Sequence, residues 1–264
     1  MNLDSLPFIF DKEAMEKGHT LPLLSGSIIP FDKPLNWSSF DVVNLFRIRT
    51  KYNWGLRKMK VGHAGTLDPK ATGLLLLCTG KATKNIEQLM NGEKEYVAEL
   101  KLGATTPSYD TEHPEDATFP WEHITYDLFL NTLKTFEGDL LQIPPLYSAT
   151  SIGGKRAYKL ARKGKEVELP PKAISIHRLE VLNFAPPYVS LRVVCSRGTY
   201  IRSLARDLGK ALGSGAYLSS LRRIRSGRFS VDRAFSIEGI DSILSHIGEE
   251  EKLLIEERLK EQSK

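Results

Sequence analysis

Hydrophobic and polar residues alternate along several short stretches of the chain, and these stretches predict β-strands. Across residues 96–102 the pattern places Tyr96, Ala98, Leu100 and Leu102 on one face and Val97, Glu99 and Lys101 on the other. Residues 74–78 are apolar without interruption, which is typical of a strand buried on both faces. We expect further strands at residues 26–30, 173–183 and 188–196.

Other stretches have the spacing of an amphipathic helix. Apolar residues recur with helical spacing at positions 201, 204, 205, 208, 211 and 212, and they predict a helix. The preceding strand connects to this helix through a turn at residues 197–199. A capping-box pattern at Ser38–Asp41 predicts a helix that continues to about Arg49. We expect further helices at residues 82–90 and 121–136, and a helical tail from Ser236. Residues 1–25 read as an extension of mixed charge.

The charge of the chain is unevenly distributed. The net charge is +5 over 264 residues, but residues 233–264 carry five Lys or Arg against eight Asp or Glu. Residues 1–232 therefore carry +8, and such a basic body suits a polyanionic partner such as nucleic acid.

The cysteines and the N-terminus indicate the compartment. The two cysteines, Cys78 and Cys195, lie in apolar runs and read as buried small residues, and their spacing fits neither a disulfide framework nor a zinc site. The N-terminus carries acids where a signal peptide needs a basic start, and no apolar run is long enough to span a bilayer. We expect a cytoplasmic protein that does not insert into a membrane.

The loop around Asp68 is the strongest candidate for chemistry. Small residues surround this carboxylate: Gly62, Ala64, Gly65 and Thr66 precede it, and Ala71, Thr72 and Gly73 follow it. Asp68 could simply open a turn with Pro69, or it could act as a nucleophile or a general base. An arginine such as Arg202 could keep it ionised. The sequence has no partner carboxylate typical of a glycosidase and no metal or nucleotide motif.

A basic segment at residues 141–171 offers a possible RNA contact. Lys155, Arg156, Lys159, Arg162, Lys163 and Lys165 cluster around Tyr147 and Tyr158. This interleaving fits a mobile arm lying on RNA, and the alternative is a solvated surface loop with a short helix, as is usual for charge runs.

Five segments together resemble one enzyme family. The segments VGHAGTLDPKATGLL, EKEYVAELKLG, QIPPLYSA, GKRAYKLARKG and VVCSRGTYIRSLARDLG are similar, in order and spacing, to the TruB-type tRNA pseudouridine-55 synthases. The resemblance runs from about Ser27 to Phe229. It implies an α+β fold with a mixed, mostly antiparallel sheet, a central cleft and flanking helices. It also implies isomerisation of uridine 55 in the tRNA T-loop, without cofactor or metal.

The resemblance assigns three catalytic residues. Asp68 matches the catalytic aspartate, which attacks a flipped-out uridine while the glycosidic bond breaks. Whether the attack is at C1′, at C6, or preceded by glycal formation stays open. Tyr96 matches the tyrosine that stacks on the flipped base, and Arg202 matches the arginine that pairs with the catalytic acid.

The resemblance also assigns four substrate-binding residues. His63 matches a residue that fills the space left by flipped bases, with a simple loop histidine as the alternative. Asp110 lies where the family has an acid that contacts the flipped uracil. Tyr200 and Leu221 match residues that line the pocket.

Two departures from the family pattern change the expectation for RNA binding. Ser151 stands where many relatives have a lysine, so one RNA contact is expected to be missing. About 35 residues follow Phe229, and they form an acidic helical tail (233–264) instead of a PUA-type domain. We therefore expect a catalytic domain at 26–232 that acts as a monomer, recognises the T-arm of tRNA alone, and needs no guide RNA.

Two other functions remain open at this stage. An RNA chaperone would fold the T-arm without chemistry, and replacement of Asp68 by Ala or Asn would leave its activity intact. A nucleoside hydrolase would release free uracil, although the sequence lacks the acidic metal cluster expected of that class.

Overall fold

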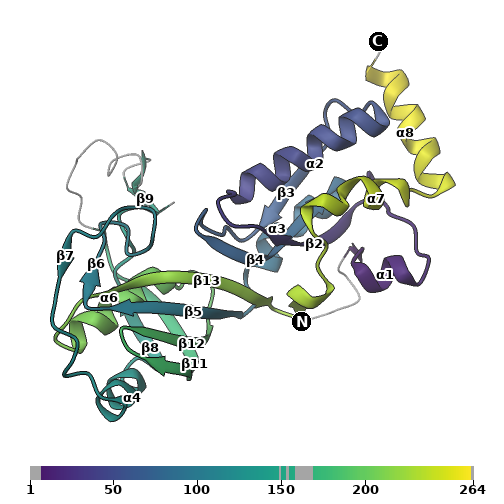
Figure 1. Ribbon diagram of the computed structural model, residues 1–264. Coiled ribbons are helices and arrows are strands. Elements are labelled where there is room, and N and C mark those ends of the chain that lie inside the picture. Colours follow the sequence, from purple (N-terminus) through teal and green to yellow (C-terminus); the bar gives the residue numbers. More distant parts are fainter. Residues whose placement is uncertain (1–6, 149, 153–154, 158–168, 263–264) are drawn as a thin grey trace. The chain divides into compact units, whose positions relative to one another are not determined.

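The computed structural model describes residues 7–148, 150–152, 155–157 and 169–262. The chain divides into two units, which can be followed by colour in Figure 1. The first unit combines the residues up to Gly92 with those from Arg223 onward, and the second unit comprises Glu93–Arg222. The second unit is therefore an insertion in the sequence of the first.

The strands of the first unit pair around one long central strand. They are β1 (Phe8–Ile9), β2 (Ser27–Lys33), β3 (Val61–Ala64), β4 (Ala71–Thr79) and β14 (Phe229–Ser230). Strand β4 pairs antiparallel with both β2 and β3, and β1 adds to β2 in parallel. Because Val61 is opposite Thr79 and Ala64 is opposite Leu76, β3 and β4 form a hairpin, and Asp68 lies in its connection.

The helices of the first unit come from both ends of the chain. They are α1 (Lys12–Glu16), α2 (Ser39–Trp54), α3 (Ile86–Met90), α7 (Ile240–Ser245) and α8 (Glu249–Gln262), with 3₁₀ helices η2 (Gly80–Asn85), η3 (Val231–Arg233) and η4 (Ile237–Gly239). Helix α2 begins at the predicted capping box between Ser38 and Asp41, and it runs five residues beyond Arg49 to a left-handed Gly55. The single helix expected at 82–90 was wrong in its first half, which is the 3₁₀ helix η2.

The core of the first unit draws on three separate parts of the sequence. Phe10, Leu21 and Leu23 from the N-terminal segment are fully buried and pack in one cluster with Phe31, Phe46 and Leu75. The C-terminal segment adds Phe235, Ile240, Ile243, Leu244, Ile247 and Ile255 to the same cluster. The N-terminal segment is thus part of the folded core from Phe10 onward.

The second unit is built on long antiparallel strands. In the order of pairing they are β5 (Lys94–Leu102), β12 (Tyr188–Cys195), β11 (Lys172–Ala185) and β8 (Gly138–Gln142). Strand β13 (Ala216–Ser226) lies beside β5 in the strand order, and its last four residues belong to the first unit. Two small ribbons pair β6 (Ala104–Thr105) with β7 (Ala117–Thr118) and β9 (Ser151–Ile152) with β10 (Lys155–Arg156).

Two helices, α4 (Tyr126–Lys134) and α6 (Ile201–Ala211), complete the described part of the second unit. Helix α6 buries Ile201, Leu204, Ala205 and Leu208, as its apolar spacing predicts. The helix expected from Trp121 was wrong at its start, because the Thr125 side chain accepts a hydrogen bond from Leu128 N (3.2 Å) and caps α4 there.

The arrangement confirms the predicted α+β class. Among the strand pairs of this sheet whose registers are described, the short β1 and β2 form the parallel pair and the others are antiparallel, so the sheet is mixed and mostly antiparallel. Residues 96, 98, 100 and 102 are the buried face of β5, as predicted, and Cys78 and Cys195 are both buried thiols. No helix in the described ranges combines the length and apolar character needed to cross a membrane.

Candidate functional site

The loop that carries Asp68 is held by its own backbone. The carbonyl oxygen of Asp68 accepts a hydrogen bond from Ala71 N (3.0 Å), which closes the turn around Pro69. The carbonyl oxygen of Pro69 accepts a second bond from Asn36 N (2.8 Å). The Asp68 side chain is half-buried, so a carboxylate is held at the surface of a fixed turn.

Two side chains from distant parts of the chain fix the same loop. Ser39 Oγ accepts a bond from Leu67 N (2.8 Å) and donates one to Leu67 O (3.1 Å). The guanidinium of Arg223, which is 2 % exposed, donates to Gly65 O (3.1 Å) and Leu74 O (2.7 Å). These bonds tie the loop to α2 and to β13, so Asp68 has little freedom to move.

Gly73 permits the close approach of Arg223 to β4. Its φ is +101°, and a Cβ at this position would lie 2.2 Å from Arg223 O. Only glycine combines that backbone conformation with the absence of a side chain.

A buried lysine lies near the candidate acid within the first unit. Lys33 is 0 % exposed, and its ammonium group donates to Pro34 O (2.9 Å) and Trp37 O (2.6 Å). Burial lowers the pKa of Lys33 to about 8, and the charge of Asp68 opposes this shift. The buried cation and the carboxylate therefore stabilise each other's charged forms.

His63 lies on β3 and is half-buried. Its Nδ1 is buried and has no hydrogen-bond partner within the part of the chain that the structure describes. Burial, reinforced by the charge of Arg223, holds the pKa of His63 below its usual value. The imidazole ring is therefore neutral at pH 7, which suits contact with an apolar group or a nucleobase.

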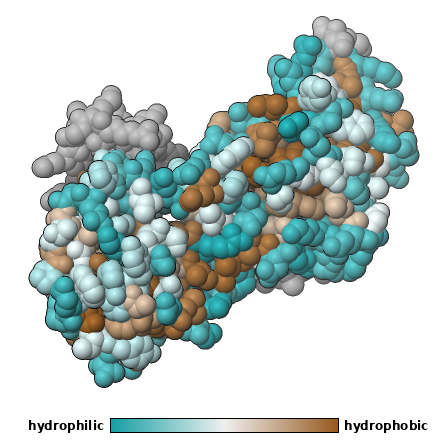
Figure 2. All heavy atoms as spheres, in the orientation of Figure 1, coloured by the Kyte–Doolittle hydropathy of each residue, from teal (hydrophilic) through white to brown (hydrophobic). Residues whose placement is uncertain are grey.

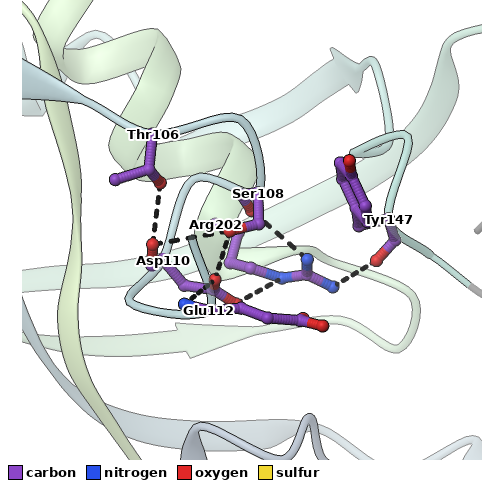
Figure 3. Close-up of polar contacts among 6 residues, drawn as sticks. All are labelled: Thr106, Ser108, Asp110, Glu112, Tyr147 and Arg202. Carbon is purple, nitrogen blue, oxygen red and sulfur yellow. Dashed lines mark hydrogen bonds and ion pairs between the residues drawn. The ribbon is translucent and has the colours of Figure 1, made fainter. Parts of the chain in front are cut away.

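Arg202 and Asp110 form a buried cluster in the second unit (Figure 3). Arg202, in the first turn of α6, donates to Ser108 O (3.3 Å) and Tyr147 O (3.0 Å), and its Nε lies 3.7 Å from Asp110 Oδ2. Asp110 Oδ1 accepts bonds from Ser108 Oγ (2.6 Å) and Glu112 N (2.9 Å). Arg202 is thus oriented by groups from two separate segments, the loop with Ser108 and Asp110 and the segment with Tyr147.

The remaining candidates also belong to the second unit. Tyr96 is buried on β5 opposite Val193, and Leu221 is half-buried on β13. Tyr200 caps the start of α6: its backbone N–H and C=O both bond the Gln142 side chain, and its hydroxyl lies 3.2 Å from Thr150 Oγ1.

The structure thus places Asp68 and His63 in the first unit and the other five candidates in the second. It brings Arg202 and Asp110 together, a contact that the sequence did not suggest. The expected pair of Arg202 with Asp68 joins the two units and stays a prediction. In the basic arm, Tyr158, Lys159, Arg162, Lys163 and Lys165 lie outside the described residues.

The sequence did not single out two residues of the site, Lys33, whose charge acts on Asp68, and Arg223, which holds the Asp68 loop. Lys33 was interpreted only as part of a turn with Pro34, although it ends the apolar strand SIIPFDK. Arg223 is one of four arginines near the end of β13, and no local pattern distinguishes it from its neighbours. Within the described residues, no group of three or more His, Cys, Asp or Glu side chains is placed to hold a metal ion.

Comparisons with known proteins match most of the chain. Residues 53–201 match the model of the TruB family pseudouridylate synthase N-terminal domain. Residues 202–260 match the model of the tRNA pseudouridylate synthase B C-terminal domain. The second match includes most of the tail that follows Phe229.

Curated relatives and a solved structure agree with these matches. A protein of Parabacteroides distasonis named tRNA pseudouridine synthase B is 54% identical over 224 residues, which cover 85% of this chain and 95% of that protein. A protein of the same name from Bacteroides fragilis is 55% identical over 79% of this chain and 89% of its own length. A solved structure titled "Crystal Structure of a Cbf5-Nop10-Gar1 Complex" aligns with a TM-score of 0.62 and 31% identity, over 88% of this chain and 58% of that chain. This chain therefore spans little more than half of that solved chain.

Proposed function

We propose that this chain, which belongs to the TruB family of pseudouridylate synthases, converts uridine 55 in the T-loop of cytoplasmic tRNA to pseudouridine. The proposal assigns the nucleophile to Asp68. The observation that carries it is the family match across residues 53–201, which contains the whole Asp68 loop. The relatives that share about half of the sequence over most of their length are named tRNA pseudouridine synthase B, which supports pseudouridine formation in tRNA.

The fixed geometry of the Asp68 loop supports the role of nucleophile. A nucleophilic carboxylate must be ionised and held still. The bonds from Ser39 and Arg223 hold the loop, and the buried ammonium of Lys33 favours a negative charge nearby. The first unit alone therefore supplies both the restraint on the loop and a nearby positive charge.

The reaction balances without a cofactor. The N1–C1′ bond of the uridine breaks, the uracil rotates, and a C5–C1′ bond forms. The proton leaves C5 and N1 gains one, so the product is an isomer of the substrate. Asp68 attacks C1′ of the ribose, attacks C6 of the uracil, or first promotes formation of a glycal.

The other candidates would bind the flipped nucleotide. In this proposal Tyr96 stacks on the uracil, which offsets about 1–3 kcal/mol of the cost of unstacking. Arg202 pairs with Asp68, while His63 fills the space that the base leaves. Asp110 contacts the uracil, and Tyr200 and Leu221 line its pocket. The Arg202–Asp110 contact already orients the arginine side chain within the second unit.

We further propose that the chain acts as a monomer and needs no guide RNA. A reaction that contains only this chain and a tRNA transcript tests that point directly, because no other macromolecule is present.

The decisive experiment is tritium release from a tRNA transcript labelled at uridine C5. The wild-type chain should release tritium, and mapping of the product should place pseudouridine at position 55. Asp68→Asn should bind the transcript and reduce release at least about 1,000-fold, since removal of a nucleophile abolishes the covalent route.

Asp241→Asn provides a matched control in the same unit. Asp241 is exposed and pairs with Arg49, so its loss should leave tritium release unchanged. Full activity of Asp68→Asn would refute the assignment of the nucleophile. Binding of tRNA by the wild type without tritium release would refute the proposed reaction, and release of free uracil would indicate a hydrolase.

A further inference from the structure

A pocket of about 420 Å³ lies in the first unit, away from the Asp68 loop. Three segments line it: Lys58–Lys60 before β3, η2 after β4, and one face of α8. Leu24 and Ser25 close a further side. Helix α8, which contributes Leu254, Glu257, Arg258 and Glu261 to the lining, is the yellow helix in Figure 1.

The wall formed by α8 is firmly attached. Glu251, in the first turn of α8, is buried and accepts hydrogen bonds from Leu24 N, Ser25 N (3.1 Å) and Ser25 Oγ (2.9 Å). Ile255, one turn further along, is buried in the core of the unit. The pocket is therefore built by fixed elements and not by a free end of the chain.

Positive charge dominates the rim of the pocket. Lys58, Lys60, Lys81, Lys84 and Arg258 line it, against the two acids Glu257 and Glu261. Arg258 is paired with Glu261 (3.1 Å), whereas the four ammonium groups have no hydrogen-bond or ion-pair partner in the described part of the chain. Against Glu257, the remaining acid of the lining, these four cations leave the rim positively charged, which favours an anionic ligand.

The floor of the pocket is apolar. Leu24, the nearly buried Met59 and Leu254 of α8 contribute to it. Figure 2 shows hydrophobic residues reaching the surface of the first unit, and Leu254 is 42 % exposed. A cavity of this volume is within the range of sites for small organic ligands. An apolar floor with a rim of cations suits a flat apolar group joined to phosphates.

We propose that this pocket binds one nucleotide, with the base on the apolar floor and the adjoining phosphates against Lys58, Lys60, Lys81 and Lys84. The source favoured here is the RNA substrate, and that part of the proposal rests on the proposed function. Strand β4 separates the pocket from the Asp68 loop by about 25–30 Å. The nucleotide bound here is therefore not the one that reacts, and the pocket is a second point of contact with the RNA.

The test compares Lys81→Gln/Lys84→Gln with a charge-matched control, Lys12→Gln/Lys134→Gln, at exposed lysines outside the pocket. Leu254→Trp fills the cavity without changing the charge. Binding of a full-length tRNA transcript is measured against salt concentration. Both pocket variants should bind about 10-fold more weakly, and Lys81→Gln/Lys84→Gln should also lower the salt slope by about 1.5, as expected for two lost phosphate contacts. The control should match the wild type.

Two further probes identify the source of the nucleotide. If the pocket variants lose affinity for an isolated T-arm hairpin to the same extent as for full-length tRNA, the bound nucleotide lies within the T-arm. If their affinity for the hairpin equals that of the wild type, the nucleotide lies elsewhere in the tRNA. Unchanged binding of both RNAs, with loss of 5′-UMP binding, assigns the pocket to a free nucleotide. The proposal is overturned if Lys81→Gln/Lys84→Gln binds more weakly and Leu254→Trp does not. It is also overturned if no pocket variant changes the binding of any probe.

The outcome can be separated from that of the proposed function. At saturating tRNA, tritium release by the pocket variants should equal that of the wild type, because the Asp68 loop is untouched. If the wild type releases no tritium, the proposed reaction fails, while the binding result still decides whether the pocket holds a nucleotide.

Discussion

The guanidinium of Arg202 and the carboxylate of Asp110 form an ion pair in the interior of the second unit, with Nε 3.7 Å from Oδ2. Both side chains are at least nine-tenths buried. Asp110 is held in turn by Ser108 and by the backbone of Glu112. The pair therefore joins the start of α6 to the loop that follows β6, and it orients a side chain that the family resemblance assigns to catalysis.

We predict that Asp110→Asn destabilises the protein by about 1–3 kcal/mol, because it removes the negative charge that lies 3.7 Å from the buried guanidinium of Arg202. The asparagine keeps an oxygen for Ser108 and Glu112, so the loss reports mainly the charge. Urea unfolding measures the change. The control is Asp116→Asn, an exposed aspartate in the same unit, which should cost less than about 1 kcal/mol. Equal effects of the two variants would contradict a role for the buried pair.

The buried ammonium of Lys33 should make stability depend on alkaline pH. Its pKa is about 8 in the folded protein against 10.5 for an ordinary lysine, so between these values the unfolded chain binds more protons. The contribution of Lys33 to the free energy of unfolding therefore rises with pH across this window, by up to about 3 kcal/mol. Below pH 8 both states are protonated, and above pH 10.5 neither is.

The comparison of wild type with Lys33→Met isolates this effect from other titrating groups. The urea midpoint of the wild type should rise relative to that of Lys33→Met between pH 7.5 and pH 10. The difference between wild type and Lys12→Met, at an exposed lysine, should stay constant. A wild-type advantage that falls with pH would show that the pKa of Lys33 is raised and not lowered.

Gly73→Ala should be severely destabilising, by about 4 kcal/mol or more, because its Cβ would meet the backbone of Arg223 at a positive φ. Gly18→Ala separates strain from contact. Gly18 also has a positive φ (+74°), but nothing lies within 4 Å of its Cβ position, so the cost should be about 1 kcal/mol. Urea unfolding, or soluble yield if the Gly73 variant does not fold, distinguishes the two. Similar costs would mean that β4 moves away from β13 easily.

Both thiols should be unreactive in the native protein. Burial raises the pKa of Cys78 and of Cys195 to about 12, so neither is ionised at pH 8. Ellman's reagent should titrate no thiol within minutes in native buffer and both in guanidinium chloride. Rapid reaction of one native thiol would indicate that its strand opens locally.

Local rules explain which elements the sequence predicted well. The alternation in β5, the capping box of α2 and the apolar spacing of α6 each depend on residues within a few positions of one another, and each is confirmed. The start of α4 was wrong, because apolar residues near Trp121 resembled a helical turn while Thr125 supplied the cap. Where two local signals compete in this way, the tertiary structure determines at which residue the helix begins.

The groups that fix the candidate site depend on contacts that no local pattern reveals. Arg223 reaches residues more than 140 positions earlier, and Arg202 meets Asp110 across 92 positions. Lys33 becomes a buried cation only because the first unit closes around it. The sequence therefore indicated the loop that carries Asp68, but not the distant side chains that hold this loop in place.

The insertion of one unit within the other sets an order for events during translation. The middle of the message encodes the whole second unit, which can complete its own core while the ribosome is still elongating the chain. The first 92 residues cannot complete their core before the second unit has been made, because Phe235, Ile243 and Ile255 belong to that core and follow the second unit in the sequence. Arg223 also follows the second unit, so the nascent chain can anchor the loop with Asp68 only after the whole second unit has been synthesised.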